Sequence, residues 1–215
     1  MMTDTIPMKR AIVFLNGELL EEDKFYKEFI KDDDDIYCAD GGAMHTYKLG
    51  KIPIEIIGDM DSVSKDVLVY YENKKTIIKR FSKDKDFTDG ELILEYLDSK
   101  NYDEVIVFAA MGGRTDHALT NLNLIFKYKK TKFISEKEEI FAVDRYFKFE
   151  NQIGKEVSFI PFSDEISRLT LKGFKFPLDR YKLKRGSSIC MSNIIIENTA
   201  EINFENGTLL CILQK

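Results

Sequence analysis

Residues 104–128 read EVIVFAAMGGRTDHALTNLNLIFKY, and this stretch decides the fold class. Its first part, Glu104–Ala109, is a short apolar run typical of a buried strand. Gly112-Gly113 marks a turn, and Arg114–Tyr128 has the apolar spacing of an amphipathic helix. A strand joined to a helix by a tight glycine turn is the repeating unit of a parallel α/β sheet.

The same strand–helix alternation recurs through the first two-thirds of the chain. The expected strands are Ala11–Leu15, Ile36–Ala39, Ile54–Ile57, Thr76–Lys79 and Glu104–Ala109, and the expected helices are Leu19–Ile30, Ala43–Leu49, Ser64–Tyr71, Asp89–Leu97 and Arg114–Tyr128. We therefore predict an α/β N-terminal domain with a parallel, Rossmann-like sheet over residues 1–135.

The pattern changes near residue 131, where short apolar runs separated by turn signals replace the helical periods. The expected strands are Phe133–Ser135, Glu139–Val143, Arg145–Glu150, Val157–Pro161, Arg168–Leu171, Ile194–Ile196, Ala200–Phe204 and Leu209–Leu213. Asn206-Gly207 between two of these runs is a strong hairpin signal. We predict a smaller antiparallel β-sandwich domain over residues 136–215.

Composition excludes several classes of protein. The 215 residues are 44% hydrophobic, which is enough for a core, and 37 acidic against 32 basic residues give a net charge of −5. A mildly acidic chain is a poor ligand for the nucleic-acid backbone, and the apolar runs are too short to span a bilayer. Three scattered cysteines without a CxxC pair suit a reducing compartment. We expect a cytoplasmic protein with neither a nucleic-acid nor a membrane partner.

Acidic residues follow four of the five expected strands: Asp40; Asp59 and Asp61; Asp84, Asp86 and Asp89; and Asp116. Because ligands of open parallel sheets bind beyond the carboxyl ends of the strands, these carboxylates belong to one rim. Carboxylates so close together repel each other unless a cation binds between them. Mg²⁺ prefers oxygen ligands and phosphate, so the rim predicts a magnesium site.

Structural explanations stay open for some of these acids. Asp59-x-Asp61 could serve an Asx turn through its own backbone hydrogen bonds. Thr88-x-x-Glu91 is a capping box, and the helix dipole alone would favour Asp89 in the first turn. Asp86 lies outside that helix and has no comparable explanation.

Groups that could bind phosphate lie on the same rim. The glycines of two strand–helix turns, Gly41-Gly42 and Gly112-Gly113, let backbone N–H groups approach an anion. Lys85 and Arg114 could hold phosphate oxygens. Each has an alternative: tight turns for the glycines, solvent for Lys85, and an ion pair with Asp116 for Arg114. Neither a Walker nor a dinucleotide motif is present, and phosphoryl-type transfer fits the residues best.

Four motifs in one order resemble the thiamine pyrophosphokinase family. They are Ala39-Asp40-Gly41-Gly42-Ala43, Gly58-Asp59-Met60-Asp61-Ser62, Lys85-Asp86-Phe87-Thr88-Asp89 and Gly112-Gly113-Arg114-Thr115-Asp116-His117. In the C-terminal half, the run from Gly186 to Ser192-Asn193 resembles the β domain of that family. The resemblance extends from about residue 10 to residue 213.

The resemblance implies transfer of pyrophosphate from the co-substrate ATP to the hydroxyl of thiamine, which gives thiamine diphosphate and AMP. It implies Mg²⁺ on Asp59, Asp61 and Asp89, and a homodimer with thiamine at the subunit interface. The remaining implied roles are a nucleotide region at Asp40, Arg114 and Asp116, and thiamine contacts at Asp89, Ser192 and Asn193.

A mechanism follows as a hypothesis. Lys85 and Arg114 would neutralise charge on the phosphates, and Asp86 or Asp116 would accept the proton of the thiamine hydroxyl. Two other functions use the same rim: a Mg²⁺-dependent nucleotide phosphohydrolase, and a non-catalytic sensor of thiamine or nucleotide. The chain contains no tryptophan, so the indole that some relatives place near thiamine is missing.

Overall fold

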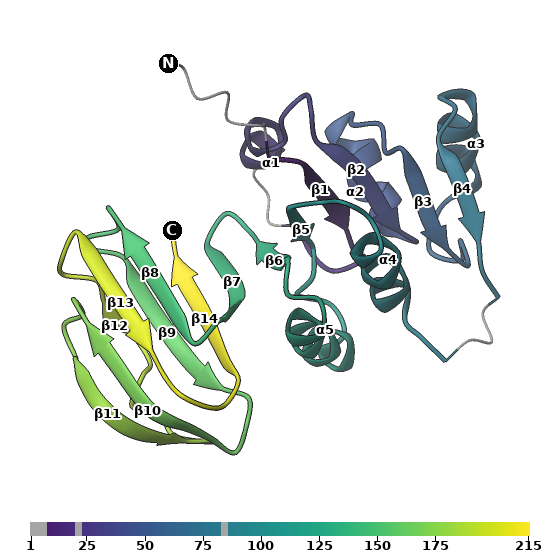
Figure 1. Cartoon of the computed structure of the whole chain (residues 1–215). Helices are drawn as coiled ribbons and strands as arrows, with labels where there is room; N and C mark the ends of the chain where they lie inside the picture. Colours follow the sequence, from purple (N-terminus) through teal and green to yellow (C-terminus); the bar gives the residue numbers. More distant parts are fainter. Residues whose placement is uncertain (1–7, 20–22, 83–85) are drawn as a thin grey trace. The chain divides into compact units, whose positions relative to one another are not determined.

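The computed structural model describes residues 8–19, 23–82 and 86–215, and Figure 1 shows their arrangement. The chain divides into two compact units, Met1–Glu136 and Lys137–Lys215. Each unit has its own set of strands and its own core of buried side chains.

The first unit contains a parallel sheet with the strand order β6-β5-β1-β2-β3-β4. Its strands are β1 (Arg10–Phe14), β2 (Asp35–Ala39), β3 (Glu55–Gly58), β4 (Ile77–Arg80), β5 (Glu104–Phe108) and β6 (Thr131–Ile134). The chain moves outward from β1 to β4 and then returns to the other side of β1 with β5. This reversal places a topological switch point between β1 and β5, where ligands of such sheets bind.

Five helices of the described chain connect these strands: α1 (Asp23–Phe29), α2 (Gly42–Leu49), α3 (Lys65–Asn73), α4 (Asp89–Asp98) and α5 (Thr115–Lys127). Helix α2 packs with α1 and α3, and α4 packs with α5 (Figure 1). Alternate residues of the strands face the layer formed by α1, α2 and α3. In the core between them, the ring centroids of Phe14 and Phe108 lie 5.2 Å apart. Both faces of the sheet are covered, which explains why its strands are almost continuously apolar.

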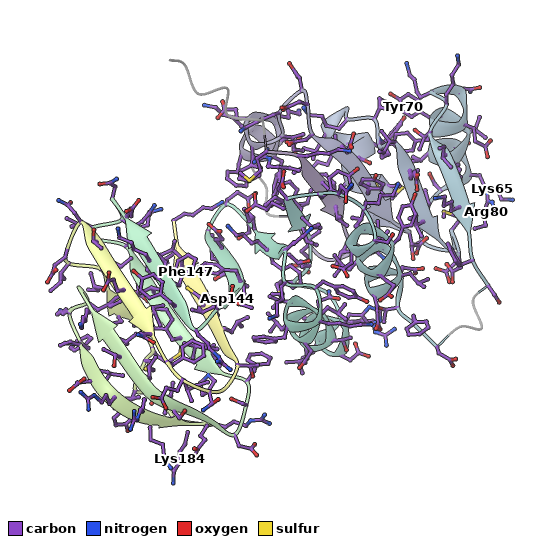
Figure 2. The ribbon with its side chains drawn as sticks, viewed as in Figure 1. Lys65, Tyr70, Arg80, Asp144, Phe147 and Lys184 are labelled. Carbon is purple, nitrogen blue, oxygen red and sulfur yellow. The ribbon has the colours of Figure 1, made fainter. Side chains whose placement is uncertain are left out.

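The second unit is a sandwich of two antiparallel sheets, with the orders β12-β9-β14-β7 and β11-β10-β13-β8. Its strands are β7 (Glu138–Val143), β8 (Tyr146–Glu150), β9 (Glu156–Pro161), β10 (Glu165–Lys172), β11 (Leu178–Lys184), β12 (Asn193–Ile194), β13 (Thr199–Asn203) and β14 (Leu209–Gln214). Side chains of both sheets form one core. Phe147, labelled in Figure 2, packs at its margin with its ring centroid 5.0 Å from that of Phe141.

The predicted fold class is confirmed, and two details differ from the sequence prediction. The strand expected at 133–135 is β6, which pairs in parallel with β5 and therefore belongs to the α/β sheet rather than to the antiparallel half. Strand β11 was not predicted. It is an edge strand on which only Leu183 is fully buried, so it lacks the apolar run by which strands are recognised.

The structure also bears on the expected reducing compartment and on the absence of a membrane-spanning segment. The three cysteines, Cys38, Cys190 and Cys211, are buried and form no disulfide. In the part of the chain that the structure describes, no helix is long and apolar enough to cross a membrane.

Candidate active site

A cavity of about 610 Å³ lies at the switch point of the parallel sheet, beyond the carboxyl ends of its strands. The loops after β1, β2, β3 and β5 and the first turns of α4 and α5 all contribute to it. Of the residues that the structure describes, the acids that line it are Asp40, Asp59, Asp61 and Asp89, and the cationic side chain is Arg114. The cavity is therefore strongly acidic before any cation or anion enters it.

Three of the acids form a tight group. One carboxylate oxygen from each of Asp40, Asp59 and Asp89 lies within 4.8 Å of the others. These residues come from three separate segments, after β2, after β3 and at the start of α4, so the fold itself brings them together. Asp61, which was predicted as a ligand beside Asp59 and Asp89, lines the same cavity but is not a member of this group.

Asp40 is the most buried acid of the cavity, with 5% of its surface exposed. Its backbone is left-handed, with φ of 42°, and its N–H donates to the carbonyl of Ile57 on the neighbouring strand. Its Oδ1 atom is buried without a hydrogen-bond partner among the described residues. Burial, followed by the charges of Asp89 and Asp59, raises the pKa of Asp40, while Ser62 opposes the shift. A bound cation would relieve this unfavourable arrangement.

Gly58, at the end of β3, keeps the space in which the acids meet. Its φ is 154°, and a Cβ atom added there would lie 2.8 Å from Asp40 Cβ and 3.1 Å from Asp89 Oδ1. Any larger residue would push the carboxylates apart. The sequence motif contains Gly58, but the reason for the glycine is visible only once β2, β3 and α4 are placed together.

The turn after β3 also contains the structural contacts expected of an Asx turn. The Asp61 N–H donates to Asp59 Oδ1 at 3.0 Å, and the Ser62 hydroxyl donates to Asp61 Oδ1 at 3.0 Å. One oxygen of Asp59 thus shapes the turn, and a carboxylate oxygen of the same residue belongs to the group of acids. The structural and the ligand roles of Asp59 are compatible.

Helix α4 holds Asp89 at its first position. Thr88 is the N-cap, and its hydroxyl accepts a hydrogen bond from the Glu91 N–H at 3.1 Å, as the capping box predicted. Phe87, Thr88 and Asp89 all line the cavity. Asp86 is exposed and is not among the lining residues of the described chain. Lys85, a predicted phosphate ligand, lies outside the described residues.

Arg114 and Asp116 form the ion pair that the sequence left open as an alternative. The Arg114 guanidinium donates to both carboxylate oxygens of Asp116, at 3.1 Å and 2.6 Å, and both side chains are exposed. This pairing lowers the pKa of Asp116 to about 2, so in this arrangement the carboxylate is a very weak base. Arg114 itself lines the cavity.

The two glycine turns differ in structure. Gly112 and Gly113 have φ of 82° and 63°, and both line the cavity, so their backbone can approach a ligand. Gly41 and Gly42 are buried against the β1 segment, where a Cβ on Gly42 would lie 2.0 Å from the Phe14 carbonyl oxygen. The close packing of α2 on the β1 segment is therefore a sufficient structural reason for glycine at positions 41 and 42.

Several polar residues of the cavity were not singled out as binding residues from the sequence, among them Asn16, His117 and Asn121. Asn16 follows β1, and His117 and Asn121 lie one turn apart on α5. Asn121 is buried and donates to the Ala110 carbonyl at 2.7 Å, which ties α5 to the loop after β5. The i, i+4 spacing of His117 and Asn121 was a signal that could have been used. His45 supports the same region through a 2.9 Å hydrogen bond with the Gly17 carbonyl.

Ser192 and Asn193 lie in the second unit, at the start of β12. The Ser192 hydroxyl donates to Glu156 at 2.8 Å. Asn193 is 1% exposed, and its amide accepts from the Phe176 N–H and donates to the Phe176 carbonyl. In this structure Asn193 thus links two backbone segments, which is a structural role, and thiamine contact by either residue stays a prediction.

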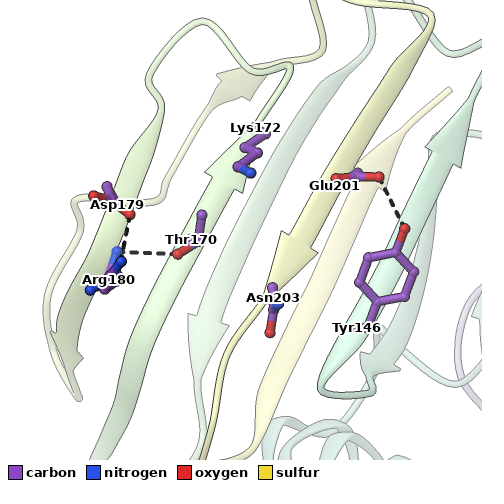
Figure 3. A pocket seen from close by; sticks show the side chains of 7 residues that line it. All are labelled: Tyr146, Thr170, Lys172, Asp179, Arg180, Glu201 and Asn203. Atoms are coloured by element: carbon purple, nitrogen blue, oxygen red, sulfur yellow. Dashed lines mark hydrogen bonds and ion pairs between the residues drawn. The ribbon is translucent and has the colours of Figure 1, made fainter.

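A second cavity, of about 240 Å³, lies on the outer face of the sheet β11-β10-β13-β8 (Figure 3). Its charged residues are two bases, Lys172 and Arg180, and two acids, Asp179 and Glu201. Tyr146 donates to Glu201 at 3.0 Å, and Arg180 lies 4.0 Å from Asp179. With no net charge and no group of converging acids, this cavity offers less chemistry than the switch-point cavity.

The fold and the first cavity define a two-domain α/β protein with an acidic ligand pocket at the switch point of its sheet. Residues 26–135 match the family described as thiamin pyrophosphokinase, catalytic domain, and residues 143–209 match thiamin pyrophosphokinase, vitamin B1 binding domain. The chain is also 34% identical over 180 residues to the thiamine pyrophosphokinase of Bacillus subtilis (strain 168), covering 81% of this chain and 84% of the relative. The chain therefore belongs to the thiamin pyrophosphokinase family.

Solved structures agree with this assignment. The thiamine pyrophosphokinase of Bacillus subtilis superposes with a TM-score of 0.85 at 28% identity, covering 96% of this chain and 99% of that one. The enzyme of Geobacillus thermodenitrificans gives 0.82 at 27% identity, with 96% and 97% covered. Yeast thiamin pyrophosphokinase, at 17% identity and a TM-score of 0.76, shares the fold, with 99% of this chain and 88% of that one covered.

Proposed function

We propose that this protein transfers the pyrophosphate group of ATP to the hydroxyl of thiamine, forming thiamine diphosphate and AMP. One observation carries the proposal: a chain with both domains of this family brings Asp40, Asp59 and Asp89 within 4.8 Å of one another in its switch-point cavity. Such a cluster matches the oxygen chemistry that a magnesium-dependent transfer of phosphate groups requires.

The residues of the cavity fit Mg²⁺. Asp40, Asp59 and Asp89 would hold it, with Asp61 beside them, because the unpartnered Oδ1 of Asp40 and the space kept by Gly58 suit a small cation with oxygen ligands. When bound, Mg²⁺ supplies positive charge that offsets the charge of the phosphate oxygens.

Arg114 and Asp116 would act together in the transfer. The exposed guanidinium of Arg114 can turn from Asp116 to a phosphate oxygen, with two N–H groups available. That movement would remove the cation that lowers the pKa of Asp116, so its carboxylate becomes a better acceptor for the proton of the thiamine hydroxyl. Asp86 remains the other candidate acceptor. Backbone N–H groups at Gly112-Gly113 would bind phosphate oxygens.

The proposal includes three further features. Thiamine would contact the second unit near Ser192, the protein would act as a homodimer with thiamine at the subunit interface, and it would work in the cytoplasm. Unpaired, buried cysteines support a reducing compartment. Exposed apolar side chains on the second unit, including Phe176 and Met191, support pairing of two chains.

The test is incubation of the purified protein with ATP, Mg²⁺ and thiamine, with thiamine diphosphate and AMP measured by chromatography. We expect equal amounts of both products, and neither when thiamine is omitted or a chelator is added. Phosphate or AMP released without thiamine would instead indicate a nucleotide phosphohydrolase. Binding of thiamine or ATP without any product would indicate a sensor.

Variants of the acids test the metal site separately. Asp59→Asn should lower turnover at least about 100-fold, because loss of an indirect partner of a metal site alone costs about 10–100-fold. Asp61→Asn should also abolish turnover while the fold survives, as predicted from the family motif. If Asp61→Asn keeps full activity and Asp59→Asn does not, the ion is held by the group with Asp40 rather than by the Asp59-x-Asp61 pair.

A further inference from the structure

Phe87 exposes an aromatic ring in the switch-point cavity. Half of its surface, 50%, is accessible, although a phenylalanine gains from burial, and it lines the cavity beside Thr88 and Asp89. Among the lining residues that the structure describes, the other apolar side chains are Leu15, Ala39 and Ala110, and the other ring is the imidazole of His117 on α5. A half-exposed ring in a polar cavity is the usual surface on which a planar ligand stacks.

A structural role for Phe87 has to be separated from a binding role. Phe87 directly precedes the N-cap Thr88, and Leu92 lies at the fourth helical position of α4. An apolar pair at these two positions is a hydrophobic staple, which fixes the entry of a helix. A staple requires only apolar bulk, whereas stacking requires a ring. Phe87→Leu should therefore preserve the staple and abolish the stacking.

The distance of Phe87 from the group of acids indicates which substrate ring, the thiazolium of thiamine or the nucleobase of ATP, can contact its side chain. Only one residue separates it from Asp89, so their Cα atoms are at most about 7 Å apart. In the proposed reaction the attacking hydroxyl is joined to the thiazolium ring of thiamine by two carbon atoms. The nucleobase of ATP is separated from the β-phosphorus by a phosphate and a ribose. The thiazolium is therefore the ring nearest the group of acids.

We propose that the ring of Phe87 stacks on the thiazolium cation of thiamine and thereby contributes to the selection of the acceptor. The thiazolium is planar and positively charged, and the face of a phenyl ring attracts such a cation. The four acids and one arginine among the described lining residues of the cavity favour the same charge. This inference rests on the proposed function, and it assigns Phe87 to acceptor specificity rather than to the phosphates.

Steady-state kinetics of the full chain test the proposal. Phe87→Leu keeps the apolar staple and removes the ring, so KM for thiamine should rise roughly 2- to 30-fold, the range of a lost cation–π contact, while KM for ATP and the thermal midpoint stay unchanged. Phe87→Tyr should restore KM for thiamine. An equal KM for thiamine in Phe87→Leu, or a rise in KM for ATP instead, would overturn the proposal.

A binding measurement gives an independent readout. The chain has no tryptophan, so Phe87→Trp would place a single indole in the cavity, and excitation near 295 nm would report on it alone. Thiamine added in the presence of Mg²⁺ and a non-hydrolysable ATP analogue should quench this fluorescence, and the analogue alone should not. Quenching by the analogue alone would contradict the assignment. Thiamine diphosphate formation by the unmodified protein tests the proposed function itself, so the two failures can be told apart.

Discussion

Asp40 combines three unfavourable features: burial, a left-handed backbone and a carboxylate oxygen that has no partner in the described part of the chain. A non-glycine residue with positive φ is uncommon, and Asp and Asn tolerate it best. Strain of this kind persists where the surrounding structure enforces it and is concentrated at functional sites. The three features together are what a ligand of a cation would show in the cation-free protein.

Asp40→Asn should therefore stabilise the protein when no divalent cation is present. Burial raises the pKa of Asp40 in the folded state above its value in the unfolded state. The free energy of unfolding therefore falls as the pH rises from the unfolded-state pKa through the folded-state pKa, and the ionised carboxylate lowers stability at pH 7. Removing the charge should raise the thermal midpoint in a chelator by roughly 2–4 °C, as expected for about 1 kcal/mol.

The response of the midpoint to Mg²⁺ completes this test. Mg²⁺ should raise the midpoint of the unmodified protein and have little effect on Asp40→Asn, because binding to the folded state alone is stabilising. Asp179→Asn, at an exposed acid of the second unit, serves as the control and should behave as the unmodified protein. A lower midpoint for Asp40→Asn in the chelator would contradict the account.

Gly58→Ala should disrupt the group of acids. The added Cβ would lie 2.8 Å from Asp40 Cβ at a φ of 154°, and strain of this kind costs about 1–3 kcal/mol. We expect both lower stability and a higher Mg²⁺ concentration for half-maximal activity. Gly50→Ala is the matched control, because Gly50 also has a positive φ, 69°, but open space around it. Gly50→Ala should lose stability while its Mg²⁺ dependence stays that of the unmodified protein. If the unmodified protein, Gly58→Ala and Gly50→Ala all had the same Mg²⁺ dependence, crowding of the acids at position 58 would be ruled out.

The sequence placed the acids and the arginine of the cavity on one rim, but it put Asp61 rather than Asp40 in the group with Asp59 and Asp89. Asp40, Asp59 and Asp89 were each placed on the rim, because strand ends can be located from apolar runs. The grouping depends on φ at Asp40, the space at Gly58 and the register of β2 and β3, all of which are set by tertiary packing. Asn193 shows the same limit, since its buried bonds to Phe176 join segments 17 residues apart.

At the scale of elements, the N-cap of α4, Thr88, directly precedes Asp89 in the chain. Thr88→Ala removes the hydroxyl that accepts the Glu91 N–H and should cost about 1 kcal/mol. Because Asp89 follows directly, activity at low Mg²⁺ should also fall, measured as the Mg²⁺ concentration for half-maximal activity.

Helix α3 provides the control for this prediction. Ser64 caps it by accepting the Val67 N–H at 3.4 Å, and Ser64→Ala should give a stability loss of similar or smaller size without any change in Mg²⁺ dependence. Two variants with equal Mg²⁺ dependence would show that the cap stabilises α4 without orienting Asp89.

Element boundaries show where sequence patterns succeed. Helix α4 was predicted over Asp89–Leu97 and spans Asp89–Asp98, because its cap and its apolar face are both local signals. Strand β11 was missed because its own residues are mostly exposed and show no apolar run. It is defined instead by its backbone pairing with β10, in a register that shifts at Leu169. The parallel pairing of β6 with β5 was equally invisible, since apolar alternation does not encode the direction of a partner strand.

At the scale of the whole molecule, the second unit leaves a set of apolar side chains exposed. Phe176, Ile189, Met191 and Ile196 are each about half accessible. The segments that carry Phe176 and Ile196 are joined by backbone hydrogen bonds from Lys175 to Ile194 and from Ile196 to Gly173. Exposed apolar residues on adjoining segments of a surface, such as Phe176 and Ile196, mark sites of association.

Sedimentation of the unmodified protein should give about twice the chain mass of 25.0 kDa. Phe176→Lys should shift the equilibrium toward single chains and lower activity in parallel, because the proposal places thiamine at the subunit interface. Lys184→Ala, at an exposed residue of β11, should change neither quantity. Full activity from a protein of single-chain mass would contradict the dimer.

The buried cysteines have a practical consequence for following the two units. Burial raises the pKa of Cys38 to about 12 and of Cys190 to about 11, and also raises that of Cys211, so none reacts as a thiolate while its surroundings are closed. Cys38 lies on β2, two residues before Asp40, whereas Cys190 and Cys211 lie in the sandwich. Alkylation of the native protein, read by mass spectrometry of the separate peptides, would therefore time the transient opening of each half without any engineered label.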